Sequence, residues 1–186
     1  MRASSSSAGS QRTRPTHCPR EVAVLCISLL AGGVACGGVD QPARARMAPE
    51  YNKTTGKLQL LKYDSNGNGT VDTWSYMDGG RILRVEIDTN EDGKIDRWEY
   101  YGADQKLERV ALATRGDGKV TRTEWYTADV LMRAEEDTDG DGRIDKWETY
   151  ENGRLAAVQF DSMHRGTPDR RLVYAADGSV RVEVAP

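Results

Sequence analysis

The sequence predicts an all-β protein, an antiparallel meander of β-hairpin repeats that is rolled or solenoid-like and follows an N-terminal signal peptide. Polar loops centred on glycine recur at intervals of 24 or 25 residues, which indicates a repeat architecture. The segments beside these loops alternate apolar and polar residues, as strands do. Short turns rich in Gly, Asn and Asp connect one loop-bearing pair of segments to the next. The glycines that mark the repeat are Gly69, Gly93, Gly118, Gly142 and Gly166.

The start of the chain is predicted to be a targeting segment. The chain has 186 residues, and residues 1–35 join a basic, Ser-rich opening to an apolar run that ends in small residues. That run is too short to span a bilayer, so we expect a signal peptide that is removed on export. The stretch Gly33-Val34-Ala35-Cys36 resembles a bacterial lipobox, which implies that Cys36 is acylated and anchors the protein at the bacterial cell envelope, on the outer membrane or cell surface. Ordinary secretion and an uncleaved anchor are the alternatives.

The rest of the chain divides into a tether and a domain. Residues 36–50 contain Gly, Pro and small polar residues without an apolar period, which predicts a flexible tether, and residues 51–186 hold the repeats. Beyond residues 1–35 there remain 26 − 4 = 22 basic and 29 − 1 = 28 acidic side chains, a net charge of −6. This balance argues against nucleic acid as a partner and suits a protein whose acids are offset by bound cations.

Each repeat is predicted to be a pair of strands. Before the second loop, Leu83, Val85 and Ile87 alternate with charged residues, and after it Trp98 and Tyr100 do the same. Flanks of about six residues are too short for stable helices, and their Val, Ile, Trp, Tyr and Thr content favours strands.

The number of strands follows from the loops and turns. Five loops imply ten strands, residues 180–184 add one more, and a half-unit near Tyr51 adds another at the front. The turns predicted to close the units lie at residues 78–80, 151–153 and 176–178, where Gly, Asn and Asp tolerate positive φ.

Two sets of recurring positions are candidates for the core. One set is aliphatic and precedes each loop by six or three residues, and the other is aromatic and follows the loops. We expect the aromatic stripe to be part of the buried face, with a sugar-binding platform as the alternative. The aliphatic set is Leu58, Ile82, Leu107, Leu131, Leu155, Leu61, Val85, Val110, Ala134 and Val158, and the aromatic set is Trp74, Trp98, Trp125, Trp147, Tyr76, Tyr100, Tyr101, Tyr126, Tyr150 and Tyr174.

The loops have the spacing of an EF-hand calcium loop, with oxygen donors at the first, third, fifth and ninth places and Gly at the sixth. The second loop (Asp88–Glu99) and the fourth (Asp137–Glu148) are complete copies, and the first (Asp64–Ser75) lacks only the carboxylate at the twelfth place. The third (Ala113–Glu124) and fifth (Asp161–Leu172) carry Ala, Arg or Met where ligands should stand. We therefore predict three loops that bind Ca²⁺ and two structural ones. Turns that need no ion are the alternative.

The predicted ligands are side-chain oxygens, with one backbone carbonyl at the seventh place of each loop. Magnesium fits less well because the loops offer many protein oxygens and few places for retained water. The ligands are Asp88, Asn90, Asp92, Lys94 (carbonyl), Asp96 and Glu99 in the second loop, Asp137, Asp139, Asp141, Arg143 (carbonyl), Asp145 and Glu148 in the fourth, and Asp64, Asn66, Asn68, Thr70 (carbonyl) and Asp72 in the first. Glu99 and Glu148 serve either as ligands or as exposed polar residues, since a strand does not swing the twelfth residue back to the ion.

The loops also resemble the calcium-loaded hairpins of integrin-type propellers, in which the ninth-place Asp binds directly and no helix is present. The stretches 150–155 and 174–178 resemble the Tyr-Asp repeats of bacterial Rhs shells and the hairpins of choline-binding modules. These resemblances imply a calcium-binding, lipid-anchored envelope protein with a structural or ligand-binding role and a protein or glycan partner. A metal-independent scaffold is the alternative, and an enzyme is not expected, because His164 is the only histidine after the signal peptide.

Overall fold

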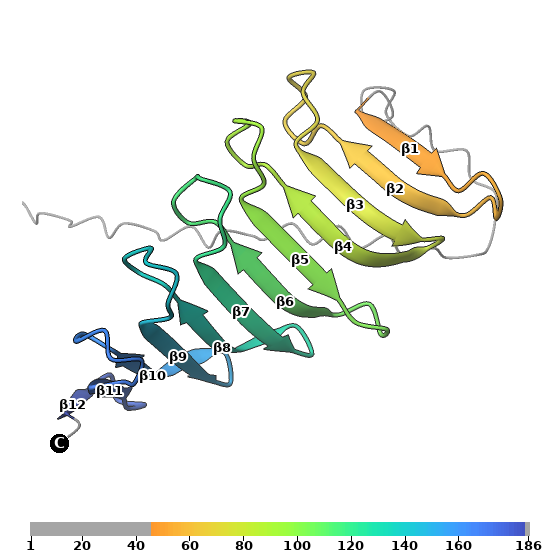
Figure 1. Cartoon of the computed structure of the whole chain (residues 1–186). Coiled ribbons are helices and arrows are strands. Elements are labelled where there is room, and N and C mark those ends of the chain that lie inside the picture. Colours follow the sequence, from red (N-terminus) through yellow and green to blue (C-terminus); the bar gives the residue numbers. More distant parts are fainter. Residues whose placement is uncertain (1–45, 185–186) are drawn as a thin grey trace, which may run out of the picture. The chain divides into compact units, whose positions relative to one another are not determined.

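The computed structural model describes residues 46–184, and it confirms the all-β prediction. Twelve antiparallel strands form one sheet in which every strand pairs with its neighbours in sequence (Figure 1). Within the described residues β1 and β12 do not pair with each other, so the sheet is an open meander and not a closed barrel. The strands are β1 (Met47–Tyr51), β2 (Leu58–Tyr63), β3 (Thr73–Asp78), β4 (Arg81–Ile87), β5 (Arg97–Tyr101), β6 (Leu107–Leu112), β7 (Arg122–Thr127), β8 (Val130–Glu136), β9 (Lys146–Glu151), β10 (Arg154–Phe160), β11 (Arg170–Tyr174) and β12 (Val180–Val184).

The loops and the turns lie at opposite ends of the strands (Figure 1). The five predicted loops connect β2 to β3, β4 to β5, β6 to β7, β8 to β9 and β10 to β11, with strands and not helices on both sides. The turns at the other ends of the strands are tight where the sequence places Gly or Asn. Between β9 and β10, Asn152 and Gly153 have φ of 51° and 74°, which is the backbone of a type I′ hairpin turn.

The sheet begins earlier than predicted. Strand β1 runs from Met47 to Tyr51 and pairs with β2, so residues 47–50 belong to the sheet and not to the tether. An edge strand tolerates Pro49 because a strand with only one neighbour can leave a missing N–H on its outer side. The predicted signal peptide and the predicted acylation site, Cys36, lie outside the described residues. None of the described residues forms a helix that could cross a membrane.

One face of the sheet, here called the valine face, holds the small aliphatic core. The residues three places before the second to fifth loops, Val85, Val110, Ala134 and Val158, are between 0% and 8% exposed, which confirms that part of the predicted core. Val110 lies opposite Glu99 on one side and Glu124 on the other. Directly opposed residues project from the same face of a sheet. The valine face therefore alternates aliphatic residues with glutamates from strand to strand.

The predicted aromatic stripe is divided between the two faces. The tryptophans lie on the other face with Tyr76 and Tyr100, which corrects the prediction that they are part of the buried face, whereas Tyr101, Tyr126, Tyr150 and Tyr174 are on the valine face. Trp98 is opposite Glu86 and Ala111, one place out of phase with Val85 and Val110. None of the described tryptophans is among the buried residues. Arginines stack on these rings instead, with Arg133 lying 3.5 Å from the centre of the Trp125 ring. The tryptophan face is thus a half-exposed layer of aromatic and basic side chains.

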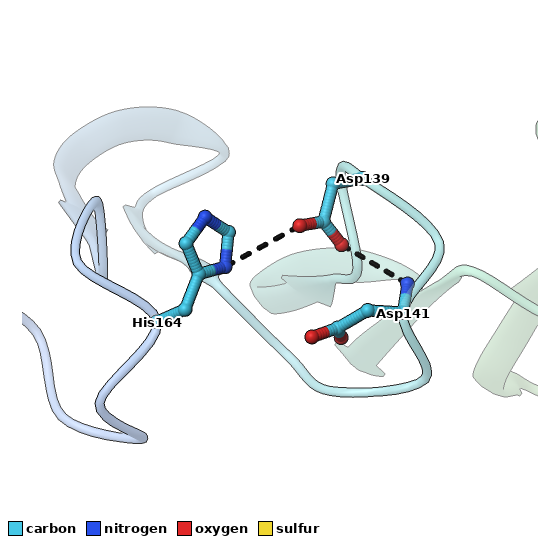
Figure 2. A group of neighbouring side chains, drawn as sticks. All are labelled: Asp139, Asp141 and His164. Carbon is cyan, nitrogen blue, oxygen red and sulfur yellow. Dashed lines mark hydrogen bonds and ion pairs between the residues drawn. The ribbon is translucent and has the colours of Figure 1, made fainter.

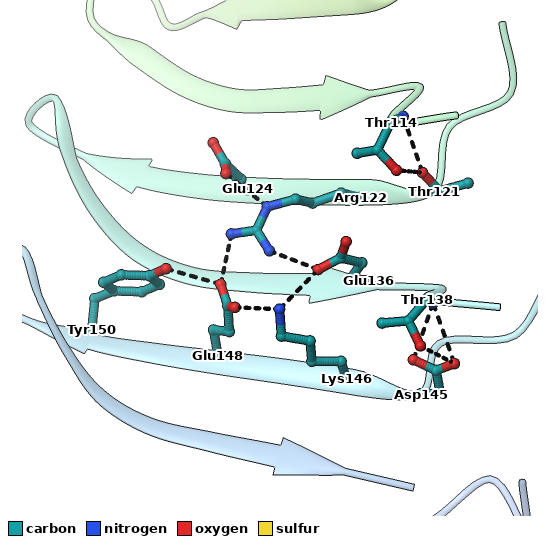
Figure 3. Close-up of polar contacts among 10 residues, drawn as sticks. All are labelled: Thr114, Thr121, Arg122, Glu124, Glu136, Thr138, Asp145, Lys146, Glu148 and Tyr150. Atoms are coloured by element: carbon teal, nitrogen blue, oxygen red, sulfur yellow. Dashed lines mark hydrogen bonds and ion pairs between the residues drawn. The ribbon is translucent and has the colours of Figure 1, made fainter. Parts of the chain in front are cut away.

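A row of charged side chains covers the valine face from β5 to β9, and Figure 3 shows its part on β7 to β9. The guanidinium of Arg122 contacts the carboxylates of Glu124, Glu136 and Glu148 at 2.6 to 3.0 Å. Lys146 bridges Glu136 and Glu148 at 3.0 and 2.8 Å. The side chain of Glu148 is only 10% exposed. Ionised groups this well covered need several partners, because water no longer solvates them.

The row repeats a short motif, a cation followed at two-residue intervals by Glu and Tyr. In each copy the tyrosine hydroxyl donates to the glutamate two residues before it, as Tyr150 does to Glu148 at 2.8 Å. The three copies are Arg97-Glu99-Tyr101, Arg122-Glu124-Tyr126 and Lys146-Glu148-Tyr150. We infer that these long side chains shield the small valines and alanines beneath them, which is how a single-layer sheet buries Val110 completely.

Candidate metal centre

All five loops share one hydrogen-bonded frame. The carboxylate at the first place accepts backbone N–H groups from the glycine turn, as Asp137 accepts from Gly140 and, at 2.9 Å, from Gly142. Asp161 does the same in the fifth loop, accepting from Arg165 and Gly166. In the third loop Ala113 stands at this place, and its carbonyl accepts from Gly116 at 3.2 Å. Local hydrogen bonds therefore hold the glycine-centred turn both in the three loops predicted to bind Ca²⁺ and in the two structural loops.

In each loop the side chain at the ninth place is hydrogen-bonded to the residue at the second place, which the sequence did not mark as a ligand. The hydroxyl at the second place bonds to the side chain at the ninth, as Thr138 Oγ1 does to Asp145 at 2.8 Å and Thr89 Oγ1 does to Asp96 at 2.8 Å. Every loop has Ser or Thr at its second place, even where the ligands are lost, and that pattern was the available signal. The five pairs are Ser65–Asp72, Thr89–Asp96, Thr114–Thr121, Thr138–Asp145 and Ser162–Asp169.

The fourth loop brings its predicted ligands together. One carboxylate oxygen from each of Asp137, Asp139 and Asp145 lies within 4.8 Å of the other two. Asp139 also belongs to a second group with Asp141 and His164 of the fifth loop, and Figure 2 shows these three side chains facing one another. The Nδ1 atom of His164 is 3.3 Å from Asp139. Carboxylate oxygens that converge in this way form the hard-oxygen environment that Ca²⁺ requires.

The second loop has the same hydrogen-bonded frame, but its carboxylates lie farther apart than those of the fourth loop. Asp88 accepts from Asp92 N–H and Gly93 N–H, at 3.2 and 2.9 Å. Within residues 46–184, however, the carboxylates of Asp88, Asp92 and Asp96 do not form a group as close as that in the fourth loop. One atom does fit an ion, because Oδ1 of Asp96 is buried and has no hydrogen-bond partner among the described residues. A buried carboxylate oxygen of this kind is costly unless something positive binds it.

The first loop uses amides in place of two acids. Asn66 and Asn68 turn their NH₂ groups toward Glu91 of the second loop, with Asn68 Nδ2 at 2.6 Å from the carboxylate. Their carbonyl oxygens face the loop backbone, where Asn68 Oδ1 accepts from Thr70 N–H at 2.8 Å. The amide oxygens are therefore on the loop side, where a ligand should be, while the amide nitrogens join two neighbouring loops.

The twelfth-place glutamates have other partners. Glu99 receives hydrogen bonds from Arg97 and Tyr101 at 2.7 and 2.6 Å, and Glu148 is held by the charged row on β9. These bonds place both carboxylates on the valine face. Glu148 is 8% exposed, so the reading of it as an exposed polar residue is wrong. The physical reason is the strand that follows each loop, which carries the twelfth residue away along the sheet.

Neighbouring loops are joined by backbone bonds. The N–H at the first place of a loop donates to the carbonyl at the ninth place of the loop before it, as Asp137 does to Thr121 at 2.7 Å and Asp161 does to Asp145 at 2.8 Å. The third loop adds a side chain, since Arg115 Nη2 donates to the carbonyl of Thr138 at 2.6 Å. Arg115 thus stands at a ligand place of its own loop but supplies positive charge to the fourth.

Two of the predicted ligands, Asp137 and Asp72, are held in the ionised form. Burial alone would raise the pKa of Asp137, but N–H bonds from Gly142 and Gly140 and the charge of Arg115 lower it below its usual value. Burial likewise opposes ionisation of Asp72, and bonds from the Ser65 and Thr73 hydroxyls lower its pKa. Ionised oxygens at neutral pH are the form that binds a metal ion.

The fold and the loops together define a β-hairpin repeat protein with EF-hand-like loops. A family model described as EF hand matches residues 85–100, which include the whole of the second loop. That match supports metal-ion binding, with Ca²⁺ as the ion of the family. No curated protein matches the chain. One solved structure that matches is the crystal structure of the GtfA/B complex bound to UDP and GlcNAc, at 7% identity and a TM-score of 0.29, with 75% of this chain and 24% of that chain covered.

Proposed function

We propose that the protein is a calcium-binding repeat protein of the bacterial cell envelope, in which bound ions fix the loops at one end of the strands. The observation that carries this proposal is the convergence of Asp137, Asp139 and Asp145 in the fourth loop. The buried, unpartnered oxygen of Asp96 in the second loop supports it independently. The first loop, with two amides in place of acids, is the weakest of the three sites because it offers less negative charge.

The chain's own residues set up each site before an ion arrives. The frame bonds at the first and ninth places orient carboxylates inward, and Thr138 and Thr89 hold the ninth-place acids in position. A bound Ca²⁺ neutralises carboxylates that would otherwise repel one another. Binding to the folded loops and not to the unfolded chain raises the free energy of unfolding.

Calcium titration with a matched pair of variants tests the proposal. Asp141 and Asp117 both stand at the fifth place of their loops, and both accept from the N–H two residues later, at 2.8 and 2.9 Å. Of these two loops, only the fourth has the other predicted ligands. Asp141→Ala and Asp117→Ala therefore remove the same turn bond, and only Asp141→Ala should reduce the Ca²⁺-dependent rise in melting temperature and the calorimetric stoichiometry by one ion.

Two results would refute the calcium role. One is a wild-type chain whose melting temperature responds neither to Ca²⁺ nor to a chelator. The other is an equal effect of the two alanine variants on the calcium response, because the variants then report a turn and not an ion site.

The cellular setting is part of the same proposal. The lipobox-like stretch before Cys36 supports attachment to a membrane by an acyl chain, and the repeated sheet supports a structural or ligand-binding role toward a protein or glycan. We propose binding and not catalysis, because every acid cluster in residues 46–184 already belongs to a loop frame or to the charged row. Mass spectrometry of the mature N-terminus tests the anchor, since an unmodified or absent Cys36 contradicts it.

A metal-independent scaffold is the second candidate, and the fifth loop favours it. Asp161 and Asp169 keep the frame bonds there although Met163 and Arg165 replace two ligands. This candidate predicts that calcium has no effect on the melting of Asp92→Ala, Asp141→Ala or the wild-type chain, so that each variant loses only its turn bond.

A further inference from the structure

We infer that the protein forms a two-fold symmetric dimer by pairing β12 with β12 of a second copy. The inference is independent of the calcium proposal. It rests on the last described strand, Val180-Arg181-Val182-Glu183-Val184, which forms one edge of the sheet.

Among the described residues, the backbone groups on the outer side of β12 have no partner strand. Ala175 N–H donates to Ser179 O in the turn before β12, and hydrogen-bonded and non-hydrogen-bonded pairs alternate along an antiparallel ladder. Val180, Val182 and Val184 therefore direct their N–H and C=O groups away from β11. Within residues 46–184 no strand lies on that side. An edge of this kind is a template for a further strand.

The valine side chains of β12 are exposed and apolar. Val180, Val182 and Val184 are 50%, 61% and 71% exposed. Val182 lies opposite Leu172 on the valine face, where the charged row ends because Leu172 replaces its glutamate. Phe160, Leu172 and Val182 form the apolar part of a groove of ≈640 Å³ over β10 to β12, in which Asp161, His164 and Arg170 are also lining residues. A strand that adds to β12 beside Val182 extends the apolar part of this surface.

The occupant is a second copy because β12 complements itself. When two such strands pair antiparallel about Val182, each valine meets a valine. Each Arg181 then meets the other copy's Glu183, which gives two opposite-charge pairs on the tryptophan face. Val182 is one of the residues with outward backbone groups, so the central pair is hydrogen-bonded, an arrangement that two-fold symmetry allows.

The opposite edge of the sheet is blocked. Asp64 N–H donates to Arg46 O, and the same alternation along β1 places the backbone of Pro49 on the outer side. Proline offers no N–H there, which is a common protection of edge strands. The dimer therefore uses β12 and closes after two copies, giving a sheet of 12 + 12 = 24 strands.

Charge reversal tests the pairing in solution. Sedimentation of the full chain over a range of concentrations should show a monomer–dimer equilibrium. Arg181→Glu and Glu183→Arg each place like charges opposite one another, and each should weaken the dimer about tenfold. An equimolar mixture of these two variants should dimerise again, because the two acids of one chain then face the two arginines of the other. A wild-type chain that stays monomeric, or variants that dimerise alone as well as mixed, would overturn the inference.

Cysteine substitution tests the register. In the proposed dimer the two Val182 residues form a hydrogen-bonded pair, with Cα atoms about 5.5 Å apart, which suits a disulfide. Val180 faces Val184 of the other copy and lies far from its own counterpart. Under mild oxidation Val182→Cys should cross-link the dimer and Val180→Cys should not, with Cys18, Cys26 and Cys36 common to both proteins. Equal cross-linking of the two variants would show another interface.

Discussion

Glu148 is a buried acid with three side-chain partners, Arg122, Lys146 and Tyr150. Burial opposes its ionisation, yet Arg122, Lys146 and Tyr150 lower its pKa to about 2. Burial and the glutamate also act on the tyrosine, raising the pKa of Tyr150. The residue thus remains an anion that ties β7 to β9 across β8. The sequence analysis treated Glu148 by its place in the loop, and the partner that decides its role, Arg122, belongs to the preceding repeat.

Replacing Glu148 tests the charged row. Glu148→Gln removes the carboxylate that Arg122 and Lys146 share, so that Arg122 keeps Glu124 and Glu136 and Lys146 keeps Glu136. The loss of charge-assisted hydrogen bonds from two cations should lower the free energy of unfolding by about 3 kcal/mol. Glu99→Gln, which has one cation partner, Arg97, should cost about 1–2 kcal/mol. Denaturant unfolding in excess chelator measures both. Equal costs for the two variants would show that the row is not cooperative.

The same residue predicts a dependence on pH. The pKa of Glu148 is about 2 in the fold against 4.5 as the ordinary value. Its contribution is therefore complete above pH 4.5 and is lost as the pH falls toward 2. The stability difference between the wild-type chain and Glu148→Gln should shrink over that range. Unfolding free energies at about pH 5.5 and about pH 3 give the check, and a constant difference would contradict the assigned pKa.

At the scale of the element, the loop is a frame to which ligands are added. The third and fifth loops keep the bond between the second and ninth places without a full ligand set, so folding of a hairpin and binding of an ion are separable properties. The first place illustrates this, because Ala113 is 5% exposed and Asp137, its counterpart in the fourth loop, is 7% exposed. The same position accepts either residue.

This separation predicts that the third loop can be repaired. The triple substitution Ala113→Asp, Arg115→Asp and Thr121→Asp adds acids at the first, third and ninth places beside the existing Asp117. The variant should bind one Ca²⁺ more than the wild-type chain in calorimetry. Arg115→Ala alone should add none, and the triple variant should lose the extra ion when Asp117→Ala is included. An unchanged stoichiometry in the triple variant would mean that the frame alone does not position ligands.

Much of each element could be predicted from its own residues. Alternation and turn chemistry placed the strands and the turn at Asn152-Gly153, and the spacing of acids placed the loops. The face on which the tryptophans lie could not be predicted in this way. Trp98 and Val85 are on different strands, and which of them share a face depends on the pairing register across the loop, which a single segment does not encode. The convergence of Asp139 with His164 is likewise a contact between loops.

At the scale of the whole molecule, stability is distributed along one dimension. Each described strand contacts only its neighbours in sequence, and the buried aliphatic residues lie between Val85 and Val158. All residues of β1 and most of β12 are exposed. Arrays of this kind lose structure from their ends.

Hydrogen exchange should show this gradient. Amides of β5 to β9 should exchange slowest, with protection falling toward β1 and β12. Calcium should increase protection mainly in the loops that bind it and in the strands beside them. The measurement is residue-resolved exchange with and without Ca²⁺. Uniform protection along the sheet would indicate a single cooperative unit and contradict the distribution of buried residues.

The strictly sequential pairing also makes copy number adjustable. A repeat contains two strands, so excising or duplicating one restores the original direction of the chain and joins surfaces that already match. Recombination within a gene of this kind would produce shorter or longer proteins that still fold, each with a different number of EF-hand-like loops.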